Sequence, residues 1–386
     1  MDKTVFQRSP SGSLVSTLSG QWGFVPHPLP PVLDSGAVMN AVVNATLALG
    51  ELNGILRTLA DPYILIQPLQ AREALTSSSM EGTYTTVDAL LLAEAGFGGG
   101  QAQSSDTREV YNYAVALRNA VSSLSELPLS LRTIRRAHSD LLRGVTRARG
   151  AHIQAGEFKQ HQNWIGAAAI EAARFVPIPP AETLPCLNQL ETWLHRDGRD
   201  QTPALLDAAL MHYQFEAIHP FSDGNGRVGR ILIPVMLYER KALSHPALFL
   251  SRALEQRKDD YIDRMFEVSR SGDWSGWITF FMEIVSQTCR DTITTADRLL
   301  LMREQYRSRL QEAGRSALLL STVDRLFIHP VFSTPQLAEY LSVTYPAAQK
   351  HLNTLLRLNI VEEIEGTSNP KYFAAREILN AITGQD

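Results

Sequence analysis

His219-Pro220-Phe221-Ser222-Asp223-Gly224-Asn225-Gly226-Arg227-Val228-Gly229-Arg230 is the stretch around which the chain is organised. Apolar residues recur at helical spacing from Ala204 to Ile218, and a nearly unbroken apolar run extends from Val228 to Tyr238. We therefore expect a loop between two buried helices. Gly224 and Gly226 let this loop turn tightly. The first N–H groups of the second helix, at the positive end of its dipole, predict a phosphate site.

The residue types in this loop indicate a chemistry. His219 titrates near neutral pH and can accept a proton from a hydroxyl group. Asp223 offers oxygen ligands of the kind that suit Mg²⁺ bound to nucleotide phosphates. Asn225 can help to hold a phosphate, and Arg227 and Arg230, one helical turn apart, can both bind phosphate oxygens. Together they predict transfer of a phosphate-containing group to a hydroxyl.

The stretch resembles the signature of the Fic family, H-P-F-x-[DE]-G-N-G-R-x-x-R, at every position. The resemblance implies an adenylyltransferase that moves AMP from ATP to a Ser, Thr or Tyr hydroxyl of a target protein. It implies His219 as the base and Asp223 as the Mg²⁺ ligand. It also implies that the remaining residues of the turn and helix start bind ATP phosphates: Gly224, Asn225, Gly226, Arg227, Val228, Gly229 and Arg230.

Two other interpretations compete for the same residues. Gly224, Gly226 and Gly229 also fit the dinucleotide fingerprint G-x-G-x-x-G, but that fingerprint follows a strand, and the pattern here is helical. The loop could also be a structural helix–turn–helix with surface arginines. A histidine, an aspartate, an asparagine and two arginines around one turn are hard to explain by packing.

Composition excludes several classes of protein. The 386 residues suffice for two or three domains, and 44% hydrophobic with 20% charged residues is ordinary for a globular protein. A net charge of −4 gives no general affinity for nucleic acid or anionic membrane. The two cysteines, Cys186 and Cys289, have no metal-binding spacing. No signal peptide or membrane span is visible, so a cytoplasmic location is expected.

The N-terminal region carries a second motif. Residues 1 to about 35 are rich in Ser, Gly and Pro and are expected to be extended, followed by a helix from Gly36 to Leu59. A further helix, at about 67–82, ends in Ser77-Ser78-Ser79-Met80-Glu81-Gly82. A carboxylate at the negative end of a helix is unfavourable without a cation nearby. By itself, this pattern also fits a solvated glutamate on a frayed helix end.

Beside the Fic signature, Ser77, Glu81 and Gly82 resemble the inhibitory motif of the family, [ST]-x-x-x-E-[GN]. Its position before the core is similar to the class that carries the inhibitory helix in the same chain. The resemblance implies that Glu81 pairs with Arg230 and takes the place of the ATP γ-phosphate. ATP could then bind, but without its α-phosphate aligned for attack.

Other segments carry weaker resemblances. The stretch from Arg143 to Gly166 and the proline-rich stretch from Ala173 to Pro180 resemble the flap of a Fic domain and predict an edge hairpin. By this analogy Phe175 and Val176 line the groove for the target backbone; a plain surface loop is the alternative. Gln256 stands where the family often has an asparagine near the nucleotide, so it is a further candidate for ATP binding.

The C-terminal part has its own organisation. Trp277, Phe280, Phe281 and Ile284 predict a buried helix face, followed by a long charged helix from about Thr288 to Ala313 that serves as a spacer or a homodimer surface. The order helix–helix–turn–helix–hairpin after Ser316 resembles a winged helix. This region has more acidic than basic residues, so protein docking is favoured over DNA binding.

The sequence therefore predicts a mainly α protein with a Fic-type helical core and a β-hairpin flap. We expect an N-terminal extension with the inhibitory helix (1–105), a catalytic domain (106–314) and a winged-helix domain (315–386). The predicted function is a self-inhibited protein adenylyltransferase that uses Mg-ATP. Removal of AMP from a modified target, and a nucleotide-sensing transcriptional regulator, are the alternatives. Other donors, such as UTP, GTP or CDP-choline, also fit a loop that binds phosphates.

Overall fold

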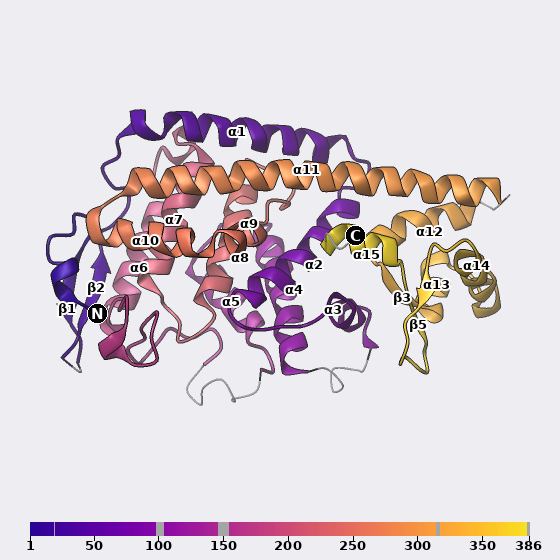
Figure 1. The fold of residues 1–386 in the computed structure, drawn as a ribbon, viewed down its shortest axis with the longest axis horizontal. Coiled ribbons are helices and arrows are strands. Elements are labelled where there is room, and N and C mark those ends of the chain that lie inside the picture. The colour runs from indigo at the N-terminus through magenta and orange to yellow at the C-terminus, as the bar shows by residue number, and fades with distance from the viewer. Residues whose placement is uncertain (19, 98–103, 146–153, 314–316, 384–386) are drawn as a thin grey trace. The chain divides into compact units, whose positions relative to one another are not determined.

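The computed structural model describes residues 1–18, 20–97, 104–145, 154–313 and 317–383. These residues are mostly helical, with small antiparallel sheets (Figure 1), which confirms the predicted mainly α class. The glycine-rich stretch that starts at Gly96 is expected to be a flexible connection, and its residues 98–103 lie outside the described residues. So do part of the segment from 143 to 166 and the expected boundary between residues 314 and 315.

The elements of the described residues follow one another in the order shown in Figure 1. They are η1 (Lys3–Val5), β1 (Gly12–Ser16), β2 (Trp22–Pro26), α1 (Ser35–Thr58), α2 (Tyr63–Ser79), α3 (Val87–Glu94), α4 (Ser105–Ser123), α5 (Leu131–Leu141), η4 (Ile170–Ala172), α6 (Pro180–Leu194), η5 (Arg199–Gln201), α7 (Ala204–Ile218), α8 (Asn225–Glu239), α9 (Ser251–Gln256), α10 (Lys258–Ser271), α11 (Trp274–Glu312), α12 (Ala317–Ile328), β3 (Val331–Ser333), α13 (Thr334–Leu341), α14 (Tyr345–Arg357), β4 (Glu362–Glu363), β5 (Tyr372–Ala374) and α15 (Arg376–Thr383).

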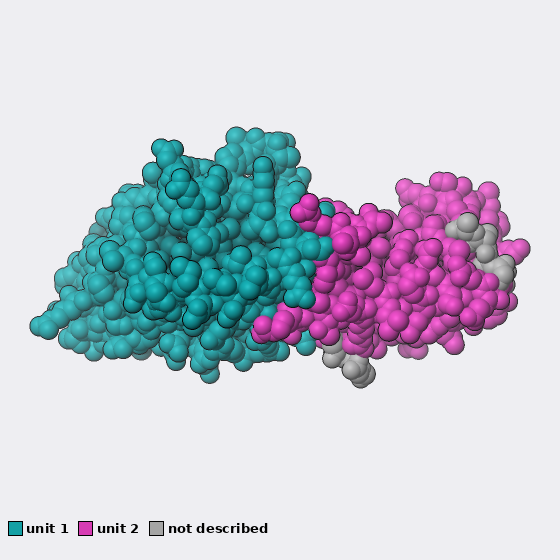
Figure 2. Space-filling model, turned by 90° about the horizontal axis from the view of Figure 1, so that it is seen from above, with its two compact units in different colours: residues 1–54, 112–289 teal, residues 55–111, 290–386 magenta. Residues whose placement is uncertain are grey.

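The chain divides into two compact units (Figure 2). Unit 1 contains residues 1–54 and 112–289, and unit 2 contains residues 55–111 and 290–386. Helices α1, α4 and α11 contribute residues to both units. The division into 1–105, 106–314 and 315–386 stays a prediction from the sequence.

The core of unit 1 is built on α7 and α8, which pack against each other. Both helices are buried along nearly their whole length, including the polar residues among their apolar ones. The aromatic face of α11 is also buried, and Trp277 donates a hydrogen bond from Nε1 to the Ala209 oxygen at 3.0 Å. This confirms the interpretation of that face as core.

The structure corrects three expectations about individual elements. Residues 12–26 are not merely extended but form the hairpin β1–β2, with Leu14 opposite Phe24. In the part of the expected edge hairpin that the structure describes, pairing is limited to one antiparallel bridge, Ile165 to Phe175. Pro180 begins α6, where proline lacks only an N–H that no helix bond would use. The aromatic and charged segments near 274–313 form one helix, α11, because nothing at their junction breaks it.

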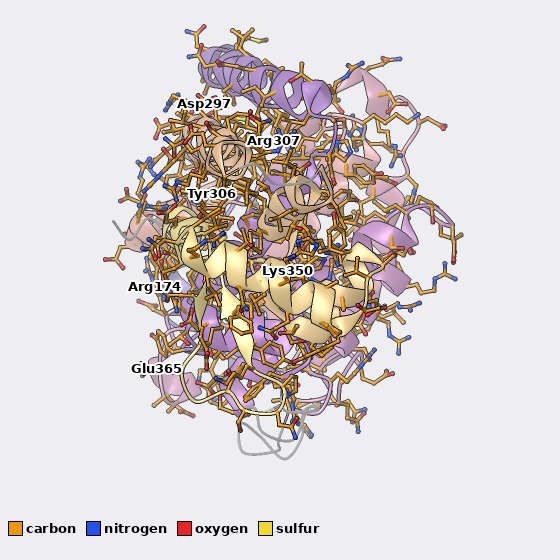
Figure 3. The ribbon with its side chains drawn as sticks, turned by 90° about the vertical axis from the view of Figure 1, so that its right-hand side faces the viewer. Arg174, Asp297, Tyr306, Arg307, Lys350 and Glu365 are labelled. Atoms are coloured by element: carbon orange, nitrogen blue, oxygen red, sulfur yellow. The ribbon has the colours of Figure 1, made fainter. Side chains whose placement is uncertain are left out.

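In unit 2, α2 packs against α12 and α15, and a small sheet has the strand order β3-β5-β4. The predicted order helix–helix–turn–helix–hairpin is present, with β3 and α15 in addition. Ser333 and Gln336 form a capping box at the start of α13. Lys350, labelled in Figure 3, lies on α14, the last helix before the hairpin strands β4 and β5. The assignment as a winged helix stays a prediction.

Within the described residues, no helix combines the length and apolar character needed to cross a lipid bilayer.

Candidate active site

His219 lies where α7 ends. Its backbone is left-handed, with φ 50° and ψ 61°, and its N–H donates to the Phe215 oxygen at 2.9 Å. This conformation is unfavourable for a residue with a Cβ and turns the chain sharply away from the helix axis. The side chain is 20% exposed, so the imidazole can be reached from solvent while its backbone is held in the core.

The loop closes on Asn225, the first residue of α8. The Asn225 side chain accepts from the Phe221 N–H and donates to the Phe221 oxygen, both at 2.8 Å. Its amide therefore holds the loop, and any contact of Asn225 with a phosphate falls to its backbone N–H. Gly224 caps the helix with φ 77°. Its conformation explains the glycine at this position.

The two arginines of the signature are buried in unit 1, with 0% of Arg227 and 3% of Arg230 exposed. Arg227 Nη2 lies 3.6 Å from Asp223 Oδ2, and the other carboxylate oxygen of Asp223 accepts from the Gly224 N–H at 2.7 Å. Guanidinium groups held in the core are preorganised anion partners, because little side-chain freedom is lost on binding. The loop thus combines a left-handed histidine, a carboxylate and two fixed cations.

Asp223 fits a magnesium ion that is held mainly by phosphates. Its carboxylate is 35% exposed at the start of α8. Among the described residues, no group of three or more His, Cys, Asp or Glu side chains could form a complete metal cage. Mg²⁺ commonly takes one or two carboxylates and completes its shell with phosphate oxygens and water. One partly exposed carboxylate beside a helix start, where free N–H groups can donate hydrogen bonds to phosphate oxygens, meets that requirement.

Three side chains that the sequence reasoning missed support the loop: His138 and Lys159, which are buried, and Asn163, which is half-buried. His138, on α5, accepts a hydrogen bond from the Gly156 N–H at Nδ1 (2.9 Å). Its Nε2 therefore carries the proton and donates to the backbone carbonyl oxygen of Asp223 at 3.1 Å. Its ring stacks on Phe221 at 3.8 Å. Burial lowers the pKa of His138 to about 4, so the ring is neutral at pH 7. Lys159 and Asn163, which precede Trp164, donate hydrogen bonds to backbone oxygens of the loop.

His212, on α7, contacts the backbone of α8 through a hydrogen bond. The Gly229 oxygen lies 3.2 Å from Nδ1, which therefore carries the proton, and Nε2 accepts from the Tyr261 hydroxyl at 2.8 Å. Burial, and secondarily the nearby Arg230 cation, lowers the pKa of His212 to about 3. This neutral histidine links α7, α8 and α10.

Glu216 is a further residue that the sequence reasoning missed. Its Oε2 lies 3.9 Å from His219 Nδ1, one helical turn away. A Cβ on Gly229 would lie only 2.2 Å from Glu216 Oε1, so the glycine leaves room for this carboxylate. The sequence signal that could have identified Glu216 is its position three residues before His219, one helical turn away. The carboxylate can orient the imidazole and stabilise its protonated form.

The other predicted site residues lie apart from the loop. Phe175 and Val176 are buried against the N-terminal hairpin, with Phe175 packed on Phe6 and Phe24. Gln256 is exposed at the end of α9, and its one polar partner among the described residues is Gln287, whose Nε2 lies 3.3 Å away. Their roles in target and nucleotide binding stay predictions.

The inhibitory motif belongs to unit 2. Ser77 is buried on α2, and Glu81 is exposed just beyond the helix end. Gly82 has φ 78°, which supports its prediction as the residue that ends the helix. The pairing of Glu81 with Arg230 stays a prediction.

Comparison with known proteins identifies the family. The model of the Fic/DOC family N-terminal region matches residues 39–122, and that of the Fic/DOC family matches residues 128–237, which include the loop. Together these matches cover half of the chain. Protein adenylyltransferase Fic of Aedes aegypti is 28% identical over 136 residues, 35% of this chain and 24% of that protein. The Drosophila virilis protein of the same name is 26% identical over 181 residues, 47% of this chain and 33% of that protein.

The chain thus matches no more than 33% of the length of these two curated relatives. Among solved structures, a Fic family protein from Desulfovibrio desulfuricans G20 is similar with a TM-score of 0.57 and 18% identity, over 90% of this chain and 98% of that one. At this identity the likeness shows a shared fold. From the family matches, the structural likeness and the complete loop signature, the chain belongs to the Fic/DOC family.

Proposed function

We propose that this chain is a protein adenylyltransferase, which transfers AMP from ATP to a serine, threonine or tyrosine hydroxyl of a target protein. The observation that carries the proposal is the loop itself. It combines an accessible His219, a partly exposed Asp223 and two buried arginines at the start of α8. The curated relatives are named protein adenylyltransferases, which supports the same chemistry for this chain.

In the proposed reaction, His219 accepts the proton of the target hydroxyl, and the hydroxyl oxygen attacks the α-phosphorus of ATP. A phosphorus–oxygen bond to the target forms as the bond from the α-phosphorus to the β-phosphate oxygen breaks. Pyrophosphate leaves with its electron pair. The N–H groups at the start of α8 and the fixed guanidinium groups of Arg227 and Arg230 stabilise the charge that develops on the phosphates.

Asp223 would hold Mg²⁺, which supplies neutralisation of phosphate charge when it is bound. Arg227, whose Nη2 lies 3.6 Å from the same carboxylate, helps to orient Asp223 within the loop. No covalent intermediate between enzyme and nucleotide is needed, because the hydroxyl attacks ATP directly.

We further propose that Glu81 restrains this reaction by pairing with Arg230 in place of the ATP γ-phosphate. Support comes from the exposed position of Glu81 directly after α2 and from the motif Ser77-x-x-x-Glu81-Gly82. A carboxylate at a helix C-terminus gains from a cationic partner, because the dipole there is negative. Removal of the carboxylate should then activate the enzyme.

The test measures transfer of label from α-³²P-ATP with Mg²⁺ to the chain itself and to proteins of a cell lysate. We expect weak labelling by the wild type, at least tenfold more by Glu81→Gly, and none by Glu81→Gly with His219→Ala. Matched controls are Glu365→Gly, at an exposed glutamate in unit 2, and His195→Ala, at an exposed histidine in unit 1. Both should label like the wild type.

Two outcomes would redirect the proposal. If Glu81→Gly labels no protein with any nucleotide, the transferase proposal fails. If pre-labelled protein instead loses AMP in the presence of wild type but not of Glu81→Gly, the chain catalyses removal of AMP.

A further inference from the structure

One short segment of unit 1 donates hydrogen bonds to four consecutive carbonyls of the catalytic loop. Lys159 Nζ lies 3.3 Å from the Ile218 oxygen, and the Lys159 backbone N–H donates to the Pro220 oxygen at 2.8 Å. Asn163 Nδ2 donates to the His219 oxygen at 3.1 Å and to the Phe221 oxygen at 2.9 Å. Every carbonyl from 218 to 221 therefore has a donor from this segment.

The two side chains also fix each other. Lys159 Nζ donates to Asn163 Oδ1 at 2.8 Å, which leaves both hydrogens of the Asn163 amide for the loop. The orientation of the amide is thereby set, because the reversed orientation would place two oxygens against each other and two donors against the ammonium group. Lys159 and Asn163 act as one unit, which we name the loop clamp.

The burial of Lys159 carries a cost in folding free energy, because its amine is removed from water. Lys159 is only 4% exposed, and burial lowers its pKa to about 7. Lysine is rarely buried without polar partners, because its amine must leave water. Both the neutral amine and the ammonium carry N–H groups, so the contacts with Ile218 and Asn163 do not depend on one protonation state.

The clamped carbonyls follow the end of α7, where intrahelical partners are missing. They also flank His219, whose left-handed backbone is unfavourable and persists only when its surroundings hold it. A backbone held at four successive carbonyls leaves the imidazole little freedom beyond its own side-chain rotation. A shift of about 1 Å in a reacting group can reduce a rate by about 10²-fold.

We propose that Lys159 and Asn163 are positioning residues of the adenylyl transfer, which hold the backbone of His219 so that its imidazole faces the target hydroxyl. This inference rests on the proposed function. Neither residue is assigned a contact with ATP or with the target. If the clamp acts only on the position of His219, its loss should slow the chemical step more than it weakens nucleotide binding.

The first test measures kcat and KM for ATP in the Glu81→Gly background. Asn163→Asp keeps the oxygen that faces Lys159 but removes both donors to the loop, and Lys159→Met removes the amine at similar length. We expect kcat to fall about 10- to 100-fold in each and KM for ATP to change less than about threefold. Lys159→Arg, which keeps a donor, should recover most of kcat.

Gln162→Leu is the matched control. Gln162 is in the same segment, but its Nε2 donates to the backbone carbonyl oxygens of Asn163 and Pro177, both at 3.0 Å, and not to the loop. Its kcat should stay within about threefold of the background. Thermal unfolding of all variants checks that the fold is retained. An unchanged kcat in Asn163→Asp and Lys159→Met, or an equal loss in Gln162→Leu, would overturn the proposal.

A second measurement does not depend on transferase activity. In protein labelled with ¹³C-histidine, the His219 ring resonance is assigned by its loss in His219→Ala. Asn163→Asp should shift or broaden this resonance, and Gln162→Leu should leave it in place. If no variant transfers label, the proposed function fails. The His219 resonance then tests the clamp by itself: an unchanged signal in Asn163→Asp overturns the positioning role.

Discussion

The catalytic loop and the flap segment around Phe175 both belong to unit 1, but they are held in different ways. The loop is fixed by polar contacts from nearby helices and from the clamp, with Asn225 closing it from within. Phe175 is fixed by apolar packing on Phe6 and Phe24, and the backbone of Val176 accepts one hydrogen bond from the Phe24 N–H at 2.9 Å. Polar networks fix geometry at particular atoms, whereas apolar packing fixes it only approximately.

The largest expected effect tests the flap side of this comparison. Phe24 is fully buried between Phe6 and Phe175, with ring centroids 5.6 and 5.7 Å away. Phe24→Ala should cost about 3–5 kcal/mol of local stability, because truncation of a buried aromatic leaves a cavity. Hydrogen exchange should accelerate at residues 12–26 and 165–176.

The amides of the catalytic loop should keep their protection in Phe24→Ala if the two regions are held independently. Leu18→Ala is the matched control, because Leu18 is exposed next to the same hairpin. Equal acceleration in the loop and the flap would show that the hairpin stabilises both.

A smaller effect concerns the support beneath the loop. The pKa of His212 is about 3 in the folded protein and near 6.5 when unfolded, so the unfolded chain binds the additional proton as the pH falls. The stability that this neutral histidine contributes is fully present above about pH 7 and is lost between about pH 6.5 and 3. From pH 6.5 to 5 the loss is at most about 2 kcal/mol.

His212→Gln, which keeps a donor for Gly229 and an acceptor for Tyr261, should flatten the decrease in unfolding free energy between pH 7 and 5. Chemical denaturation at several pH values between 7 and 5 measures the unfolding free energy of each variant. His195→Gln, at an exposed site, should retain the wild-type dependence. A His212→Gln profile parallel to the wild type would mean that the pKa of His212 is the same in the folded and unfolded states, and would contradict its lowering by burial.

The smallest expected effect concerns Glu216. Its carboxylate, 3.9 Å from His219 Nδ1, can stabilise the imidazolium formed when His219 takes a proton. Glu216→Gln should lower kcat about tenfold, about 1.4 kcal/mol in activation free energy, with KM for ATP nearly unchanged. Steady-state label transfer in the Glu81→Gly background measures it. A change confined to KM would place Glu216 in nucleotide binding instead.

The comparison also explains what the sequence could predict. The loop carries its histidine, carboxylate, turn glycines and arginines within twelve residues, and helical periodicity identifies α7 and α8 on either side. These signals are local, so the loop and its helices were predicted. The mainly α class followed from the same periodicity.

The remaining features depend on contacts between distant parts of the chain. β1 and β2 are stabilised by Phe175, about 150 residues later, and nothing near Phe24 signals that partner. Lys159 and Asn163 read as surface polar residues until the loop lies against them. His138 likewise gains its role only through its stack on Phe221. Single-sequence patterns cannot report such pairings.

The most direct measurement of the proposed chemistry compares two labels on Glu81→Gly. With α-³²P-ATP the label should become covalently attached to protein and survive denaturation, and with γ-³²P-ATP it should not, because the γ-phosphate leaves in pyrophosphate. His219→Ala in the same background should abolish the α-label. Attachment of the γ-label would contradict adenylyl transfer and indicate phosphorylation, and an α-label that persists in His219→Ala would contradict the role of His219 as the base.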